Sequence, residues 1–157
     1  MAEAELNEFG LLEPGVHPMT LDEVSALFGR FQRTDRRMKL IDRLRQFVKA
    51  VRDADARIEI YVDGSFVMGK VEEPDDIDVI LILPAEWNAA AELRPFEYNI
   101  VSKRMVRKLY GFDMIVVVAG QQTVADAIAF FSQVNPKWRE SMGIPPRTTK
   151  GLIEVQR

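Results

Sequence analysis

The sequence predicts an α/β fold, in the broad sense that includes α+β, and three observations predict it. Two runs rich in β-branched residues and leucine, 77–83 and 112–118, are nearly continuous, as expected of strands buried on both faces. Residues 57–62 alternate around Ile58, Ile60 and Val62, which is typical of a half-buried strand. Segments with apolar residues at every third or fourth position surround these strands and predict helices that cover the sheet.

The N-terminal third is expected to contain two helices. Residues 1–19 contain Pro14, Gly15 and Pro18, and we expect an irregular segment there. Thr20 with Glu23 three residues later is a capping box, so a helix should begin here and span residues 21–28. A longer helix is expected over residues 34–54, and its many basic side chains are interpreted as a solvated face.

The remainder alternates between short elements. Residues 66–70 are expected to form a single helical turn, residues 95–109 a helix that ends before Gly111, and residues 123–131 another helix. The segment 136–150 is basic and proline-rich, and residues 151–155 are expected to form a final edge strand. We interpret residues 1–157 as one domain, with 57–118 as its core and 136–157 as a C-terminal tail.

Composition narrows the chemistry. The chain has no cysteine and a single histidine, His17, so thiolate chemistry and histidine-rich metal sites within one chain are excluded. Carboxylates remain, and hard oxygen ligands favour Mg²⁺ or Mn²⁺. The net charge of −3 confines any nucleic-acid contact to a local patch or to bound cations. Neither a signal peptide nor an apolar run of about 20 residues is present, so we expect a cytoplasmic protein without a membrane partner.

Polar residues with a recognisable chemistry fall at the ends of the expected strands. Gly64 and Ser65 follow the first strand, and their backbone and hydroxyl groups suit a phosphate. Asp76 and Asp78 flank Ile77, and side chains two apart on a strand share one face. Asp113 begins the next buried strand, so the three carboxylates are expected to meet around one or two divalent cations.

Several further residues have open roles. Lys70 is interpreted either as a ligand of the β- and γ-phosphates or as a surface lysine. Asp63 is assigned to the turn, with a role as an additional ligand kept as an alternative. The basic cluster on residues 103–108 is expected to be a solvated helix face rather than a binding site for triphosphate or RNA. Trp87 and Trp138 are expected to pack rather than to stack on bases.

These motifs resemble those of the polymerase-β-like nucleotidyltransferase superfamily. The stretch from Gly64 to Lys70 resembles its Gly-Ser-x-x-x-Gly element, Asp76-Ile77-Asp78 its Asp-x-Asp element, and Phe112-Asp113-Met114 its third, hydrophobic–Asp–hydrophobic element. A closer likeness, extending over the whole chain, is carried by residues 9–28, 63–67 and 150–153, which resemble those of small bacterial nucleotidyltransferase-like proteins. The resemblance implies a nucleotidyltransferase fold, which is a small mixed sheet flanked by helices. This sequence departs from the family pattern at Phe66, because small members of the superfamily often carry a small or basic residue after Gly-Ser.

The resemblance also implies an activity: transfer of a nucleoside monophosphate from a nucleoside triphosphate to a protein or RNA acceptor. By this resemblance, Asp76, Asp78 and Asp113 are expected to bind the metal and to act as the catalytic residues. Gly64, Ser65 and Lys70 are expected to hold the triphosphate. Some relatives belong to toxin–antitoxin or phage-defence pairs, which implies a partner protein from a neighbouring gene. Two alternatives stay open, namely a non-catalytic antitoxin or regulatory subunit of the same fold, and a metal-dependent nuclease.

Overall fold

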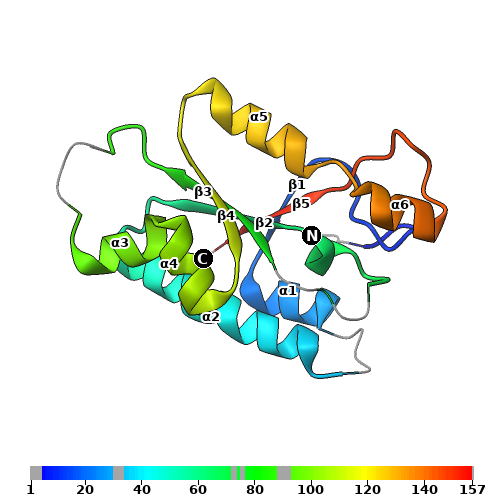
Figure 1. Ribbon diagram of the computed structural model, residues 1–157, viewed down its shortest axis with the longest axis horizontal. Coiled ribbons are helices and arrows are strands. Elements are labelled where there is room, and N and C mark those ends of the chain that lie inside the picture. Colours follow the sequence, from blue (N-terminus) through cyan, green and yellow to red (C-terminus); the bar gives the residue numbers. More distant parts are fainter. Residues whose placement is uncertain (1–4, 30–33, 72–73, 75–76, 88–92, 157) are drawn as a thin grey trace.

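The computed structural model describes residues 5–29, 34–71, 74, 77–87 and 93–156 (Figure 1). In chain order, the first half contains β1 (Val16–Met19), α1 (Leu21–Phe28), α2 (Arg36–Ala54), β2 (Glu59–Asp63), the 3-10 turn η1 (Ser65–Val67) and β3 (Asp78–Leu83). The second half contains α3 (Pro95–Val101), α4 (Lys103–Tyr110), β4 (Asp113–Val118), α5 (Gln122–Phe131), α6 (Pro136–Met142) and β5 (Leu152–Val155). The predicted α/β class, in its α+β form, is confirmed.

The strands form one mixed sheet in the order β1-β5-β2-β3-β4. β2 is antiparallel to both of its neighbours, β5 and β3, while the pairs β1–β5 and β3–β4 are parallel. The three strands that carry the predicted motifs, β2, β3 and β4, are therefore consecutive neighbours in the sheet. The sheet brings residues 50 positions apart in sequence, such as Asp63 on β2 and Asp113 on β4, to the same end of the sheet, on either side of Asp78.

Two predictions about the chain ends are wrong. Residues 1–19 are not wholly irregular, because Val16–Met19 form the edge strand β1, which includes His17. Residues 152–155 are not an edge strand, since β5 lies between β1 and β2. The reason is the same for both: each segment is short, and its hydrogen-bond partner is the other end of the chain. Local patterns carry no information about such a pairing.

Each face of the sheet has its own hydrophobic core, and the alternation of the strands separates them. Val79, Leu81 and Leu83 of β3 point into the main core with the helices α1 to α4. Ile80 and Ile82 point to the opposite face, where α5 covers β3 and β4. Figure 1 shows this division, with α5 on one side of the sheet and α1 to α4 on the other. Any residue in phase with Ile80 thus faces α5.

The helix predictions hold with two corrections. The capping box of Thr20 and Glu23 is present at α1. The single helix expected over residues 95–109 is divided into α3 and α4, because Ser102 adopts an extended backbone conformation and its hydroxyl accepts a hydrogen bond from Met105 N. The tail contains α6, which Asn135 caps by accepting from Lys137 N and which Pro136 begins.

Within the described residues, no helix combines the length and the apolar character needed to cross a membrane.

Candidate functional site

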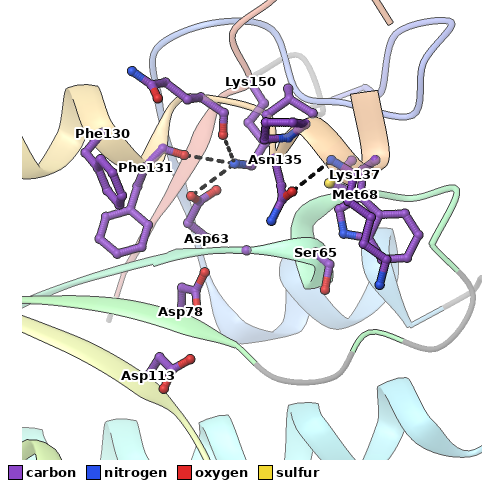
Figure 2. A pocket seen from close by; sticks show the side chains of 15 residues that line it. Asp63, Ser65, Met68, Asp78, Asp113, Phe130, Phe131, Asn135, Lys137 and Lys150 are labelled. Atoms are coloured by element: carbon purple, nitrogen blue, oxygen red, sulfur yellow. Dashed lines mark hydrogen bonds and ion pairs between the residues drawn. The ribbon is translucent and has the colours of Figure 1, made fainter. Parts of the chain in front are cut away.

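Three aspartates form a row across neighbouring strands at one end of the sheet. Asp63, the last residue of β2, is paired in register with Asp78, and Asp78 is paired with Asp113. Each aspartate lies two residues along its strand from a residue of the core that packs against α5; on β3, for example, this residue is Ile80. The three side chains therefore lie on the α5 face of the sheet. Figure 2 shows their carboxylates one below another on the same side of the strands. The register of the sheet therefore gathers the acidic side chains that the sequence places far apart.

The turn after β2 brings its backbone against this row. Gly64 has a φ of +87°, which favours glycine, and a Cβ atom at this position would lie 2.9 Å from Asp78 Oδ2. Ser65 then begins the 3-10 turn η1, and Met68 N donates to the Ser65 carbonyl oxygen at 3.0 Å. Only a glycine at position 64 leaves room for the Asp78 carboxylate beside the turn. The predicted neighbourhood of Gly64, Ser65 and Asp78 is thus present.

A buried arginine holds the segment that follows. Arg37 of α2 is 1% exposed, and its guanidinium donates to the carbonyl oxygens of Phe66, Met68 and Val71 at 2.6–2.8 Å. Burial lowers the pKa of Arg37 to about 10, so the side chain keeps its charge at neutral pH. The prediction that the basic residues of this helix form a solvated face is wrong for Arg37. It anchors the turn on which Ser65 lies.

Asp63 is paired with a lysine from the C-terminal segment. Lys150 Nζ donates to Asp63 Oδ2 at 3.2 Å and to the carbonyl oxygens of Phe131 and Gln133, both at 2.9 Å. Both charged side chains are almost fully buried. Asp63 Oδ1 is also buried and meets no hydrogen-bond donor at good geometry among the described residues. Lys150 therefore links the sheet end to the connection between α5 and α6.

The environment of Asp63 changes its acidity. Burial raises its pKa to about 7; the neighbouring charge of Asp78 adds to the rise, whereas the Lys150 ammonium opposes it. The assignment of Asp63 to a turn thus misses its main features, which are burial and a charged partner. The alternation of β2 does indicate which face of the sheet Asp63 is on, since Asp63 follows Tyr61 on the face opposite Ile60. No local pattern in the sequence indicates that Lys150, 87 residues away, is its partner.

The raised pKa of Asp63 predicts a pH dependence of stability. Its pKa of about 7 exceeds the ordinary 3.8, so between these values the folded chain binds more protons than the unfolded chain. The free energy of unfolding then falls as the pH rises. Relative to Asp63→Asn, which lacks this proton, we expect the wild type to lose up to about 4 kcal/mol between about pH 4 and 7, since one pKa unit corresponds to roughly 1.4 kcal/mol. Urea denaturation of both proteins across this range measures the difference, and a constant difference would contradict the prediction.

Asp78 and Asp113 interact with each other and with a basic helix. Burial raises the pKa of Asp78, and the charge of Asp113 raises it further. Asp113 is more exposed, and it forms an ion pair with Arg107 of α4. The rest of the basic cluster on α4, Lys103, Arg104 and Lys108, is exposed as expected. The Arg107 contact places this basic helix at the edge of the site.

The row of aspartates forms one side of a cavity of about 470 Å³. The connection from α5 to α6 forms the opposite side. Besides the three aspartates, the cavity is lined by Gly64, Ser65, Met68, Phe130, Phe131, Gln133, Val134, Asn135, Pro136, Lys137, Trp138 and Lys150. Trp138 is half-buried against a small core with Met68, in line with the packing role predicted for it, and it also faces this cavity. A volume in this range is typical of small-molecule sites.

The predicted site residues divide into three groups. Gly64, Ser65, Asp78 and Asp113 all line the cavity. Lys70 is exposed and lies outside the lining, beside Gly10 near the N-terminus. Asp76 lies outside the described residues. Within the described part of the chain, no group of three or more acidic or histidine side chains is close enough to hold a metal ion.

Fold and site together define a class: a mixed α+β protein whose sheet end gathers carboxylates beside a glycine-serine turn and a cavity of about 470 Å³. The chain belongs to a family of unknown function, DUF6932, whose sequence pattern it matches over residues 4–156. No curated protein and no solved structure matches the chain.

Proposed function

We propose that this protein is a metal-dependent nucleotidyltransferase, which transfers a nucleoside monophosphate from a nucleoside triphosphate to a protein or RNA hydroxyl. The observation that carries the proposal is the pairing of Asp78 with Asp113 in register on parallel strands, beside the Gly64-Ser65 turn. A metal–triphosphate complex requires carboxylates that bind the metal and a turn that binds phosphate, and this cavity contains two carboxylates and the glycine-serine turn.

The donor set fits a hard divalent cation. Asp78 and Asp113 offer carboxylate oxygens, and the raised pKa of Asp78 reflects burial and the repulsion between the two charges. A cation between them relieves that repulsion, which favours its binding. Asp78 and Asp113, joined by Asp76 as the sequence motif predicts, would hold Mg²⁺ or Mn²⁺. When bound, the metal supplies positive charge that neutralises the triphosphate and acidifies the acceptor hydroxyl.

The side chains then have distinct roles. The Gly64 backbone and the Ser65 hydroxyl hold the triphosphate oxygens, which aligns the α-phosphorus with the acceptor. The exposed carboxylate of Asp113 turns from Arg107 to the acceptor hydroxyl and takes its proton. The acceptor oxygen forms a bond to the α-phosphorus, while the bond from that phosphorus to the bridging oxygen breaks and pyrophosphate leaves.

A second candidate is a non-catalytic protein of the same architecture, an antitoxin or a regulatory subunit. It is favoured by the ion pairs of the chain's own cations with two carboxylates of the row, Lys150 with Asp63 and Arg107 with Asp113. Lys70, a candidate phosphate ligand, also lies outside the cavity lining. In either case, the resemblance to toxin–antitoxin and phage-defence relatives suggests a partner protein encoded by a neighbouring gene.

Calorimetry and a turnover assay distinguish the two candidates. The purified protein is titrated with each of the four nucleoside triphosphates in the presence and absence of Mg²⁺. Pyrophosphate release is then measured with total RNA and with total protein as acceptors. Metal-dependent binding with acceptor-dependent pyrophosphate release supports the transferase, and metal-dependent binding without release supports the non-catalytic candidate. An absence of nucleotide binding would contradict the transferase and would also support the non-catalytic candidate, in which the chain's own cations pair with the carboxylates.

A further inference from the structure

The cavity has two chemically different ends. Its sheet end is acidic and carries Asp78 and Asp113, whereas the end of α5 contributes aromatic rings. Metal-bound phosphates account for the polar end but leave the aromatic end without a ligand. A molecule that fills the whole cavity must combine anionic groups with an apolar, preferably planar, part.

Phe130 is the residue that gives the aromatic end its character. It is the most exposed large hydrophobic side chain that the structure describes, at 64%, and it lines the cavity. Its ring meets the ring of Phe131 edge-on, with the centroids 5.5 Å apart. The last turn of α5 therefore presents a phenylalanine to a mostly polar cavity. Leaving such a ring in water forgoes its burial energy, which a planar ligand would recover.

The backbone behind this ring is firmly held. The carbonyl oxygen of Phe131 accepts a hydrogen bond from Lys150 Nζ, whose ammonium is itself buried against Asp63. Lys150 N also donates to the Ser132 carbonyl oxygen at 2.8 Å. These contacts tie the end of α5 to the end of β2. Phe130 is consequently presented at a defined position relative to the carboxylates, and a preorganised surface loses little entropy when a ligand binds.

The arrangement in the cavity sets the direction of a bound nucleotide. In Figure 2, Ser65 and Lys137 lie on one side of Asp63, Phe130 and Phe131 lie on the other, and Asp78 lies between the two groups. A triphosphate with its terminal phosphates at Ser65 has its α-phosphate near Asp78. Its nucleoside then extends towards Phe130.

From this geometry we propose that Phe130 is the stacking platform for the base of the bound nucleoside triphosphate. The inference rests on the proposed function, because it names the part of the substrate that the aromatic end takes. A phenylalanine ring offers no hydrogen bonds and stacks on purines and pyrimidines alike. The platform therefore strengthens binding of all four nucleoside triphosphates and adds nothing to the binding of inorganic tripolyphosphate.

Binding measurements on Phe130→Ala test the platform. With Mg²⁺ present, we expect this variant to bind ATP, GTP, CTP and UTP about tenfold more weakly than the wild type, which is typical for the loss of one stacked ring. Its affinity for Mg²⁺–tripolyphosphate should not change. Phe130→Trp should bind the four nucleotides at least as tightly as the wild type. Phe96→Ala is the matched control, because Phe96 is 47% exposed on α3 and lies outside the cavity lining.

Three outcomes would overturn the inference, and they separate it from the proposed function. If Phe130→Ala binds nucleotides as the wild type does, the platform is wrong while the metal–triphosphate site stands. If it loses tripolyphosphate and nucleotides equally, Phe130 supports the cavity and does not bind the base. If the wild type binds neither nucleotide nor tripolyphosphate, the proposed function and the platform fail together.

Discussion

Asp78→Asn is expected to abolish nucleotide transfer without weakening the fold. The amide keeps the shape of the side chain but removes the charge that a divalent cation needs. Metal stabilisation of a transition state is worth several kcal/mol, which corresponds to a loss of about a thousandfold or more in the transfer rate. Transfer of label from an α-labelled nucleoside triphosphate to the acceptor measures that rate. Calorimetry of the same variant should show the loss of Mg²⁺-dependent nucleotide binding.

The stability of Asp78→Asn makes this result diagnostic. In the wild type, burial and the nearby charge of Asp113 both disfavour the Asp78 carboxylate, as its raised pKa shows. A neutral side chain escapes both costs, so the variant should melt at the same temperature as the wild type or higher. Asp126→Asn, on the exposed side of α5, is the control and should leave transfer unchanged. Full activity in Asp78→Asn would contradict the proposed mechanism.

Residues with a local pattern could be predicted from the sequence, and those with a distant partner could not. The strands and the positions of Gly64, Asp78 and Asp113 follow from apolar runs interrupted by polar residues. The register that brings Asp78 beside Asp113 does not follow from either run alone, because it depends on pairing between strands 35 residues apart. Lys150 could not be assigned to the site, since its role arises from contacts with Phe131 and with Asp63, which precedes it by 87 residues.

The wrong predictions near the C-terminus have two different physical causes. The expected edge strand at the C-terminus became an inner strand because β1, at the opposite end of the chain, pairs with it. The basic and proline-rich composition of residues 136–150 favours a tail, whereas Asn135 followed by Pro136 is a helix-start signal, and α6 begins there. In this segment the short-range signal is correct and the composition is misleading.

Periodicity, and not composition, predicts the position of Arg37. The basic composition of its helix favours a solvated face, yet Arg37 precedes the buried residues Ile41, Leu44 and Val48 by four, seven and eleven positions. Those spacings place it on the apolar face. An arginine on such a face must find acceptors, and Arg37 finds three carbonyl oxygens in the segment after Ser65. The sequence thus contained the position of this residue but not its partners.

Arg37→Met is accordingly expected to cause the largest loss of stability. Methionine fills part of the space but leaves the carbonyl oxygens of Phe66, Met68 and Val71 buried without this donor. Each buried carbonyl group left without its donor costs about 1–3 kcal/mol, so the three together should lower the free energy of unfolding by at least about 3 kcal/mol. Urea denaturation should report this loss. Arg37→Lys should also destabilise, because one ammonium cannot reproduce the planar fork that reaches three carbonyl groups.

A variant on the same helix separates burial from charge. Arg45 also belongs to α2, but it is partly exposed and pairs with Asp22 near the surface, so Arg45→Met should cost less than about 1 kcal/mol. Equal losses in the two variants would show that Arg37 acts through helix propensity or net charge and not through its carbonyl partners. If the loss is confined to Arg37→Met, one arginine both stabilises the fold and holds the turn that carries Ser65, the proposed phosphate ligand. Milder substitutions there should then weaken triphosphate binding before they unfold the protein.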